Sequence, residues 1–555
     1  MTLIIPLLIL LPLFVGLGMF LAGTKAESLV GLALGASGLV LALSLLLLFQ
    51  VCGAALPDSA TNGATIIARV GYAPDWLHIR LPVSVGGHPV YWHLQFGADG
   101  IGALLVLLTG IVGFVTMIMA THQIRERLVS YLALILITQS MLLGVFLSMD
   151  LLSFYLFFEA VLLPIILLIN GWGNKAESLK ASRKFLLYTL VGSVPMVIGL
   201  IGIALQSATP VRPSTVSLEL LSAIAKENQL AAINAAPGDA LNSVSTLASK
   251  DQWIAWILLL GFGIKLAILP LHTWLPTTYA AAHPNTTALI ASVVAKLGVF
   301  GIIRIVIPLT PLALSTYAQM LFGGLGALAI VYGALVALSQ SDMRKVLAYS
   351  SISHVGFITL GLMSMNSEGL SGAAIQMFNH GIITCSMFLI LAMLEQRRGP
   401  VSLDDEDCGL ASIYPKLAVM MVFFTLAGAG LPGLNGFVGE LLAMTGMIRV
   451  SGLFTAIAVL GTVLGAWYGL RIVQRVLFGS NGEGKSKVHA QVNGDLKATE
   501  FAPLLALACI CLFIGVRPQD SMDLIENDIK RIVSVSEPSS KAVHSEIDQL
   551  AQTQP

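Results

Sequence analysis

Long apolar stretches restrict this chain more than any other feature of its sequence. The stretches at residues 3–22, 28–50 and 100–120 contain no Asp, Glu, Lys or Arg. Each has about the 20 residues that a helix needs to cross the hydrocarbon core of a bilayer. Backbone inside lipid must satisfy its own hydrogen bonds, which leaves helices or a closed barrel, and continuous apolar runs without alternation exclude the barrel. We therefore predict an all-α polytopic membrane protein.

The composition agrees with this class. Of the 555 residues, 56% are hydrophobic and 11% are charged, which is too little charge to cover a soluble protein of this length. The net charge is zero, so it favours no acidic or basic partner, and nothing supports nucleic-acid binding. The cysteines make no CxxC pair, and we interpret them as small hydrophobic residues without a metal or redox role: Cys52, Cys385, Cys408, Cys509 and Cys511.

About fourteen spans fit the apolar pattern, and two of them carry helix breakers. The span at 253–282 contains Pro270 and Pro276, and the span at 414–450 contains Pro432 among several glycines. Proline removes a helical hydrogen bond and clashes with the preceding turn, so we predict a discontinuous helix in each. The predicted spans are 3–22, 28–50, 100–120, 128–148, 150–170, 182–205, 253–282, 286–308, 315–338, 343–364, 371–394, 414–450, 452–478 and 500–516.

The two broken spans lie five spans apart, which favours an internal repeat. An odd number of spans per unit inverts the second unit, and inverted repeats with broken helices at matching positions are typical of transporters. We therefore predict two inverted five-helix repeats, made of spans 4–8 and 9–13. The chain is predicted to begin with two helices and an outer-side loop (1–99) and the third helix (100–127). The first repeat (128–308) and the second repeat (309–480) follow. A loop, the last helix and a polar tail (481–555) end the chain.

Basic residues predict the orientation. The loops after spans 4, 8 and 10 contain no lysine or arginine, and basic loops mark the cytoplasmic side. The N-terminus, the segments 51–99 and 206–252 and the tail 517–555 are therefore predicted on the outer side. We interpret 206–252, which is rich in Ala, Ser and Asn, as a loose insertion. The basic loops follow spans 3, 5, 9, 11 and 13 and carry Arg125, Arg127, Lys175, Lys180, Arg183, Lys184, Arg344, Lys345, Arg397, Arg398, Lys416, Lys485, Lys487 and Lys497.

Ionisable side chains inside the spans are the candidate functional residues. A charge at mid-bilayer costs a few kcal/mol, so residues of this kind are paired, hydrated or in use. Arg304, nearer the outer end of its span, is interpreted as an interface anchor. The candidates begin and end with an acid and have lysines and histidines between. A lateral proton relay requires such a series of titratable groups, each able to change protonation and to shift the pKa of its neighbours. In chain order they are Glu159, Lys265, His272, Lys296, His354, His380 and Glu440.

Each candidate also has a structural interpretation. Glu159 could lock two helices together, Lys265 could reach for the interface, and His272 could cap a broken helix end. The two other histidines could be hydrogen-bonded core residues, and Glu440 could be an acid favoured by a helix N-terminus. Five of them (Glu159, Lys265, Lys296, His380 and Glu440) lie in separate spans, which favours the relay.

Several motifs resemble the antiporter-like subunits of respiratory complex I, with the M-type (chain 4) as the best match. The resemblance covers about residues 100–480 in order. It is carried by Phe157-Phe158-Glu159, the Lys-x4-Pro-Leu-His-x-Trp-Leu-Pro run from Lys265 to Pro276, Ala295-Lys296-Leu297-Gly298, the run from Asp342 to Gly356, Asn379-His380-Gly381, and the run from Leu431 to Glu440.

This resemblance implies a function that composition does not show. Members of the family translocate protons, driven by NADH oxidation and quinone reduction elsewhere in the complex. The family's titratable residues on helices 5, 7, 8, 11 and 12 fall on Glu159, Lys265, Lys296, His380 and Glu440. Glutamate at the last position is typical of M-type subunits, whereas lysine is typical of L- and N-type subunits and of sodium/proton antiporters.

Cofactors and partners are implied in the same way. The chain has no nicotinamide, flavin or iron–sulfur motif of its own, so the resemblance implies that NADH, FMN, iron–sulfur clusters and quinone bind partner subunits. It also implies L- and N-type neighbours and a place in a bacterial inner membrane.

The chain departs from the family pattern after Trp274-Leu275-Pro276. Thr277-Thr278-Tyr279 replaces a common Asp-Ala-His, and His283-Pro284-Asn285-Thr286-Thr287 replaces an Ala-Pro-Thr-like run. This change puts the route of proton uptake on the cytoplasmic side in question. Two alternatives stay open: a subunit of a multi-subunit sodium/proton antiporter, and a subunit of a ferredoxin- or hydrogenase-linked homologue of complex I. A scaffold that has lost transport is disfavoured, because the ionisable residues are present.

Overall fold

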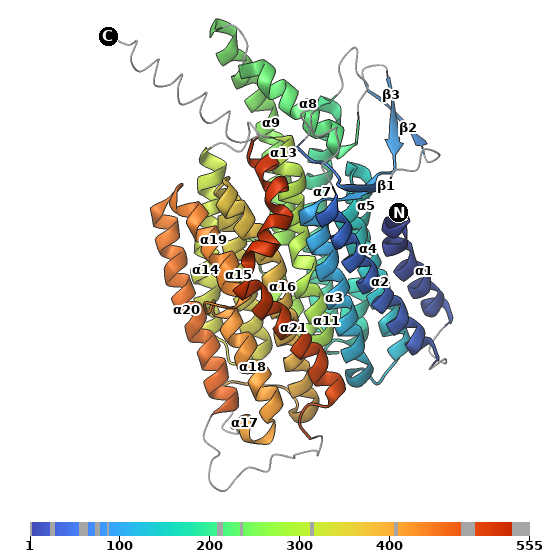
Figure 1. The fold of residues 1–555 in the computed structure, drawn as a ribbon, viewed down its shortest axis with the longest axis vertical. Coiled ribbons are helices and arrows are strands. Elements are labelled where there is room, and N and C mark those ends of the chain that lie inside the picture. Colours follow the sequence, from blue (N-terminus) through green and yellow to red (C-terminus); the bar gives the residue numbers. More distant parts are fainter. Residues whose placement is uncertain are drawn as a thin grey trace.

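The chain folds into a bundle of long helices that run roughly alongside one another (Figure 1). The structure is a computed structural model, and it describes residues 3–22, 28–54, 65–72, 78–85, 88–207, 215–233, 237–310, 316–404, 409–478 and 494–534. Cys408, Lys485, Lys487 and the part of the tail beyond residue 534 lie outside these ranges. The predicted class, an all-α membrane protein, is confirmed.

Twelve helices in the described ranges are long and apolar enough to cross a membrane. They coincide with twelve of the predicted spans. Their bounds are Ile4–Ala22, Leu29–Gly53, Gly100–Gln123, Leu128–Leu147, Leu151–Trp172, Ser178–Gln206, Pro284–Leu309, Tyr317–Ser339, Met343–Met363, Ser367–Arg398, Gly452–Leu477 and Ala498–Val516. As labelled in Figure 1, they are α1, α2, α3, α4, α5 with α6, α7, α11 to α13, α14, α15, α16, α20 and α21.

The two remaining predicted spans are interrupted as expected. Helix α9 (Pro237–Leu266) stops before Pro270, and α10 (Trp274–Ala281) starts after it. Helix α18 (Pro415–Gly428) stops before Pro432, and α19 (Asn435–Ile448) starts after it. The total of fourteen spans and the inverted pairing of the two repeats stay predictions.

Connecting segments at one end of the bundle are more ordered than predicted. The segment 51–99 contains four short strands, paired antiparallel as β1 (Val70–Tyr72) with β4 (Phe96–Ala98) and β2 (His78–Val85) with β3 (His88–His93). The interpretation of 206–252 as a loose insertion is wrong where the structure describes it. Helix α8 (Leu218–Ile233) occupies its middle, because Leu218, Leu221 and Ile224 recur at helical spacing and are buried.

Three segments predicted on the outer side contact one another at this end. The backbone N–H of Thr65 donates to Ser222 Oγ at 3.2 Å, which ties the strand segment to α8. Residues 518–534 of the predicted polar tail are helical, and Asp528 accepts from Arg69 at 3.2 Å and from the N–H of Gly100 at 2.7 Å. These contacts support the prediction that the segments share one side of the membrane. The prediction that this side is the outer one remains.

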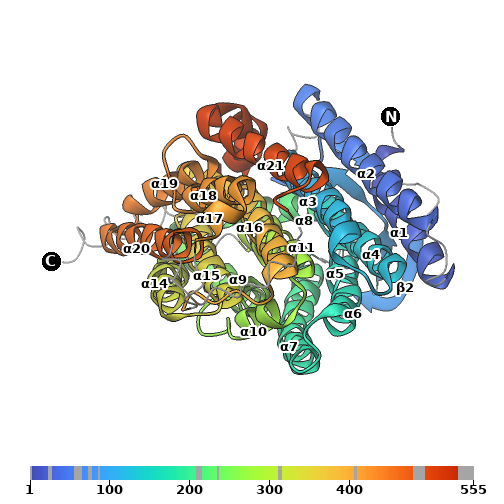
Figure 2. The ribbon, with the colours of Figure 1, turned by 90° about the horizontal axis from the view of Figure 1, so that it is seen from below.

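Helices α11 to α13 and α16 form the enclosed centre of the bundle, with α1 and α2 at one edge and α14 and α20 at the other (Figure 2). Glycines let α16 and α19 approach closely. A Cβ atom at Gly372 would lie 2.4 Å from the backbone nitrogen of Ala443, and one at Gly439 would lie 2.3 Å from Gln376 Oε1. This small-residue contact brings the helix that carries Glu440 against the helix that carries His380.

Candidate functional site: two buried groups of titratable side chains

Glu159 and Lys265 form a buried ion pair between α5 (Leu151–Ala160) and the end of α9. Lys265 Nζ lies 3.2 Å from Glu159 Oε1, and Ser193 on α7 donates its hydroxyl to the same oxygen at 2.6 Å. The lysine side chain is 4% exposed and the glutamate side chain is 20% exposed. The carboxylate therefore keeps one open edge, at the boundary of the subunit.

The helix break holds the lysine in place. Helix α9 ends at Leu266, and Ala267 takes a left-handed conformation with φ of 59°. The indole N–H of Trp274 donates to the carbonyl of Ile264 at 2.9 Å and thus ties α10 to the end of α9. Lys265 Nζ lies 3.9 Å from the ring centroid of Phe158, where the ring face also stabilises the cation.

A second group of buried side chains runs through the centre of the bundle. Lys296 Nζ lies 2.9 Å from His380 Nδ1 on α16. The ring of His380 lies 5.3 Å from the ring of His354 on α15, centroid to centroid. His354 Nδ1 lies 2.8 Å from Glu440 Oε1 on α19. The structure therefore brings four of the seven predicted residues into one continuous row, and all four are buried.

The backbone around Lys296 is irregular, which the sequence analysis did not predict. The expected single helix is a series of short pieces: α11 (Pro284–Ser292), a 3-10 turn at Val294–Lys296, α12 (Leu297–Gly301), a π-helix at Ile302–Val306 and α13 (Ile307–Leu309). Such irregular turns free backbone carbonyls and are common at functional sites. Here Lys296 Nζ donates to the freed carbonyl of Ala291 at 2.8 Å.

Two further polar side chains join this row, and the sequence analysis missed both. Gln376 Nε2 donates to Glu440 Oε1 at 3.4 Å, and the hydroxyl of Tyr468 on α20 lies 3.2 Å from His354 Nε2. Gln376 could have been found, because a buried amide in an apolar span needs a partner. Tyr468 carried no such signal, since tyrosine is common near membrane interfaces.

Unpaired buried atoms lie beside the same row. His380 Nε2 and Gln376 Oε1 are buried without a hydrogen-bond partner among the residues that the structure describes. Buried polar atoms in folded proteins nearly always have a partner, which is often an ordered water. The two atoms thus indicate places where water completes the row.

His272 belongs to neither group. Its Nε2 atom lies 3.2 Å from the hydroxyl of Tyr332 on α14, and its Nδ1 atom is buried without a partner among the described residues. No described hydrogen bond joins it to Lys265 or Lys296. Its place among the relay residues stays a prediction.

The two groups lie on helices that touch. Helix α12 packs against the end of α9, and a Cβ atom at Gly298 would lie 2.5 Å from the carbonyl oxygen of Phe262. Only a residue without a side chain permits this contact. It brings the turn after Lys296 close to the turn before Lys265.

The sequence suggested that Arg304 anchors the chain at the membrane interface, and this interpretation is wrong. Arg304 is buried and forms an ion pair with Asp99, which precedes α3. Asp528 and Arg69 lie beside this pair, and burial together with the Asp99 carboxylate raises the pKa of Asp528 to about 6. The pairing explains how an arginine is accommodated at this depth.

Within the described ranges, no group of three or more His, Cys, Asp or Glu side chains is placed to hold a metal ion. The titratable side chains instead form one ion pair and one row, and within each group every side chain lies within hydrogen-bond or ring contact of the next. Such an arrangement suits the movement of protons.

The fold and these two groups define a polytopic helical membrane protein with a buried row of titratable side chains. A family model described as NADH:quinone oxidoreductase/Mrp antiporter, transmembrane region, matches residues 148–465. The chain is 34% identical over 463 residues to NADH-quinone oxidoreductase subunit M of Rhodobacter capsulatus, covering 83% of this chain and 84% of the relative. The chain thus belongs to the NADH:quinone oxidoreductase/Mrp antiporter transmembrane family.

Solved structures show the same fold. A chain in the structure of respiratory complex I from Thermus thermophilus with bound NADH superposes with a TM-score of 0.78 at 30% identity, covering 96% of this chain and 99% of that one. A chain in the structure of the Mrp complex from Dietzia sp. DQ12-45-1b superposes with a TM-score of 0.74 at 20% identity, covering 98% and 99%. The second likeness concerns the fold alone. Both relatives are parts of multi-subunit membrane complexes.

Proposed function

We propose that this chain is a proton-translocating, M-type membrane-arm subunit of a complex I-type NADH:quinone oxidoreductase. The observation that carries the proposal is the buried row from Lys296 through His380 and His354 to Glu440, in which each member lies within hydrogen-bond or ring contact of the next. The similarity to subunit M of Rhodobacter capsulatus supports the assignment of the complex.

Electrostatic repulsion supplies a direction for the proton. The rings of His380 and His354 lie 5.3 Å apart, and two unit charges at that distance repel by roughly 3 kcal/mol at an effective dielectric constant of about 20. Two positive charges on this pair of rings are therefore disfavoured. A proton passed from Lys296 to His380 drives a proton on His354 toward Glu440.

Glu159 is the point at which a neighbouring subunit acts. Its carboxylate neutralises Lys265 across 3.2 Å and has an open edge at the subunit boundary. A charge at that edge weakens the ion pair and alters how firmly Lys265 holds its proton. We expect the neighbours to be L- and N-type subunits, and the redox cofactors (FMN and iron–sulfur clusters), NADH and quinone to lie on partner chains.

The surroundings of Glu440 favour H⁺ over Na⁺ as the transported ion. Hard cations need a shell of oxygen ligands. Glu440 instead faces nitrogen atoms, His354 Nδ1 and the donating Gln376 Nε2. This observation supports H⁺ as the ion that Glu440 carries.

The location follows from the basic loops. We propose that the end of the bundle with Arg344 and Arg397 faces the cytoplasm of a bacterial cell. The end with α8 and the 518–534 helix then faces out. We also propose that residues 128–308 and 309–480 are the two inverted repeats. The first holds the Glu159–Lys265 pair, and the buried row runs from Lys296 in the first repeat to His380, His354 and Glu440 in the second.

Co-purification tests which complex contains the chain. The chain is isolated from gently solubilised membranes, and every co-purifying protein is identified by mass spectrometry. We expect flavin and iron–sulfur subunits together with quinone-reducing activity. Small membrane partners without any redox protein would instead indicate a cation/proton antiporter.

Substitutions of the Glu159–Lys265 pair test the proton path. Glu159→Gln and Lys265→Ala are expected to abolish or strongly reduce proton pumping in proteoliposomes while the complex still assembles, because each removes one partner of a buried ion pair. Glu177→Gln and Lys180→Ala, at exposed positions, are the matched controls and should pump normally. Wild-type pumping in both variants of the pair contradicts the relay.

A further inference from the structure

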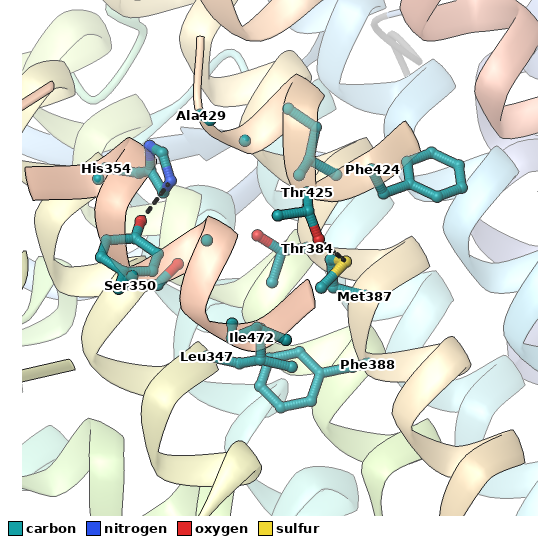
Figure 3. A pocket seen from close by; sticks show the side chains of 15 residues that line it. Leu347, Ser350, His354, Thr384, Met387, Phe388, Phe424, Thr425, Ala429 and Ile472 are labelled. Carbon is teal, nitrogen blue, oxygen red and sulfur yellow. Dashed lines mark hydrogen bonds between the residues drawn. The ribbon is translucent and has the colours of Figure 1, made fainter. Parts of the chain in front are cut away.

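A small cavity leads to His354 from the side of α20 (Gly452–Leu477). Figure 3 shows it between α15, α16, α18 and α20, with His354 at its edge. Its polar lining consists of Ser350, Thr384, Thr425 and Tyr468. It offers ≈ 40 Å³ to the centres of water molecules, and about 10–15 Å³ of such space holds one water, so there is room for about three.

The cavity lies between the buried row and the end of the bundle that carries the basic loops. Leu347 and Ser350 line it one to two turns after α15 begins at Met343, beside the basic loop. Phe388 lines it on α16, in the half of that helix that ends at Arg398. The cavity therefore extends from His354 toward this end.

Tyr468 connects the cavity to the row. Its hydroxyl lies 3.2 Å from His354 Nε2, and Ser350 lines the same cavity. The other ring nitrogen of His354, Nδ1, lies 2.8 Å from Glu440 Oε1. The imidazole thus has one nitrogen toward the cavity and the other toward the carboxylate, which is the arrangement that passes a proton through the ring.

We propose that protons from the basic-loop side reach His354 through this cavity, and that the Tyr468 hydroxyl is the group that delivers them. The hydroxyl donates its proton to His354 Nε2 and is reprotonated by the proton that arrives through the cavity water, while the Nδ1 proton moves to Glu440 Oε1. No net charge stays on the tyrosine. The inference rests on the proposed proton-translocating function. It adds a site of proton uptake that is built from neutral polar side chains rather than charged ones.

Two kinds of variant test the inference in the intact complex, reconstituted in liposomes with a pH-sensitive dye. Tyr468→Phe removes only the hydroxyl, and Tyr414→Phe makes the same change at the start of α18. Gly465→Val fills the cavity, because a Cβ atom at Gly465 meets nothing nearer than 3.9 Å. Gly452→Val makes that change on the same helix, where a Cβ atom meets nothing within 4 Å.

We expect proton uptake per quinone reduced to fall in Tyr468→Phe by the share that this subunit carries, because a proton-transfer group is lost, and to fall likewise in Gly465→Val. Uncoupled quinone reduction should be unchanged in both, and replacing H₂O by D₂O should slow uptake more in Tyr468→Phe than in the wild type. Both controls should behave as the wild type. A purely structural role would not alter the isotope effect.

Normal uptake in either Tyr468→Phe or Gly465→Val overturns the inference. Glu440→Gln, measured in parallel, separates this failure from that of the proposed function. If Glu440→Gln blocks uptake and the cavity variants do not, only the cavity route is wrong. If Glu440→Gln also pumps normally, the relay itself is wrong.

Discussion

The ion pair between Asp99 and Arg304 permits a stability prediction in which charge and capping can be separated. Both residues are 4% exposed, and Asp99 Oδ1 also caps α3 by accepting the N–H of Gly102 at 2.8 Å. Asparagine caps helices as well as aspartate does. Asp99→Asn therefore removes the charge and keeps the cap.

The magnitude follows from the burial of the pair. Removing one partner of a buried ion pair costs about 3–5 kcal/mol, because the other charge is left without compensation. Asp528 reduces this cost, since its carboxylate lies close enough to Asp99 for the two to repel each other. We expect Asp99→Asn to lower the free energy of unfolding by about 3 kcal/mol, at the lower end of that range.

A double-mutant cycle measures the pair directly. Arg304→Met replaces the arginine by an apolar side chain of similar length, and the double variant buries no unpaired charge. We expect it to lie within about 1 kcal/mol of the wild type, because it leaves no buried charge uncompensated and the asparagine keeps the cap. The assay is unfolding of the solubilised protein in increasing fractions of dodecyl sulfate. Additive effects of the two single substitutions would refute the pairing.

Three further predictions concern other parts of the chain. The pKa of Asp528 is about 6 when its helix is docked, above the value near 3.9 expected when the helix is undocked. Docking is therefore strongest below pH 4 and weakens as the pH rises through 6. Hydrogen exchange should show tighter docking of residues 518–534 at pH 5 than at pH 7.5, and Asp528→Asn should abolish this difference. Ala267 has a positive φ, which glycine adopts freely and a β-branched residue does not. Ala267→Gly should therefore be tolerated, whereas Ala267→Val should lower both the thermal midpoint and the pumping rate. Equal behaviour of the two variants would argue against the left-handed turn. Gly439→Val should cost about 1–3 kcal/mol through overpacking against α16, measured as a lower unfolding midpoint, and an unchanged midpoint would show that the two helices are not in close contact.

Much of the fold could be predicted because the bilayer restricts the backbone so strongly. Apolar length predicts the spans, and Pro270 and Pro432 predict the two breaks, since both effects are local in sequence. The strands at residues 70–98 could not be predicted in this way. Their pairing depends on contacts outside the membrane, where the sequence is not restricted to helices.

The candidate site was predictable in its charged members but not in its contacts. Buried charges are rare in spans, so Lys296 and Glu440 stand out in the sequence. Their connection through two adjacent histidines depends on how close α15, α16 and α19 approach, which glycines far apart in the chain permit. Tyr468 and Gln376 were missed because neutral polar residues in spans occur for many reasons. Arg304 was misinterpreted because its partner, Asp99, lies about 200 residues away in the sequence.

Proton translocation by the Glu440→Gln variant tests the central claim most directly. The substitution keeps the size of the side chain and removes its ability to take up a proton beside His354. Glu368→Gln, at a surface ion pair with Arg449, is the matched control. In proteoliposomes of the intact complex, we predict that Glu440→Gln lowers the protons moved per quinone reduced by the share that this subunit carries, because a proton-transfer group is lost, while the control equals the wild type. Wild-type translocation by Glu440→Gln would contradict the proposal that this buried row carries protons.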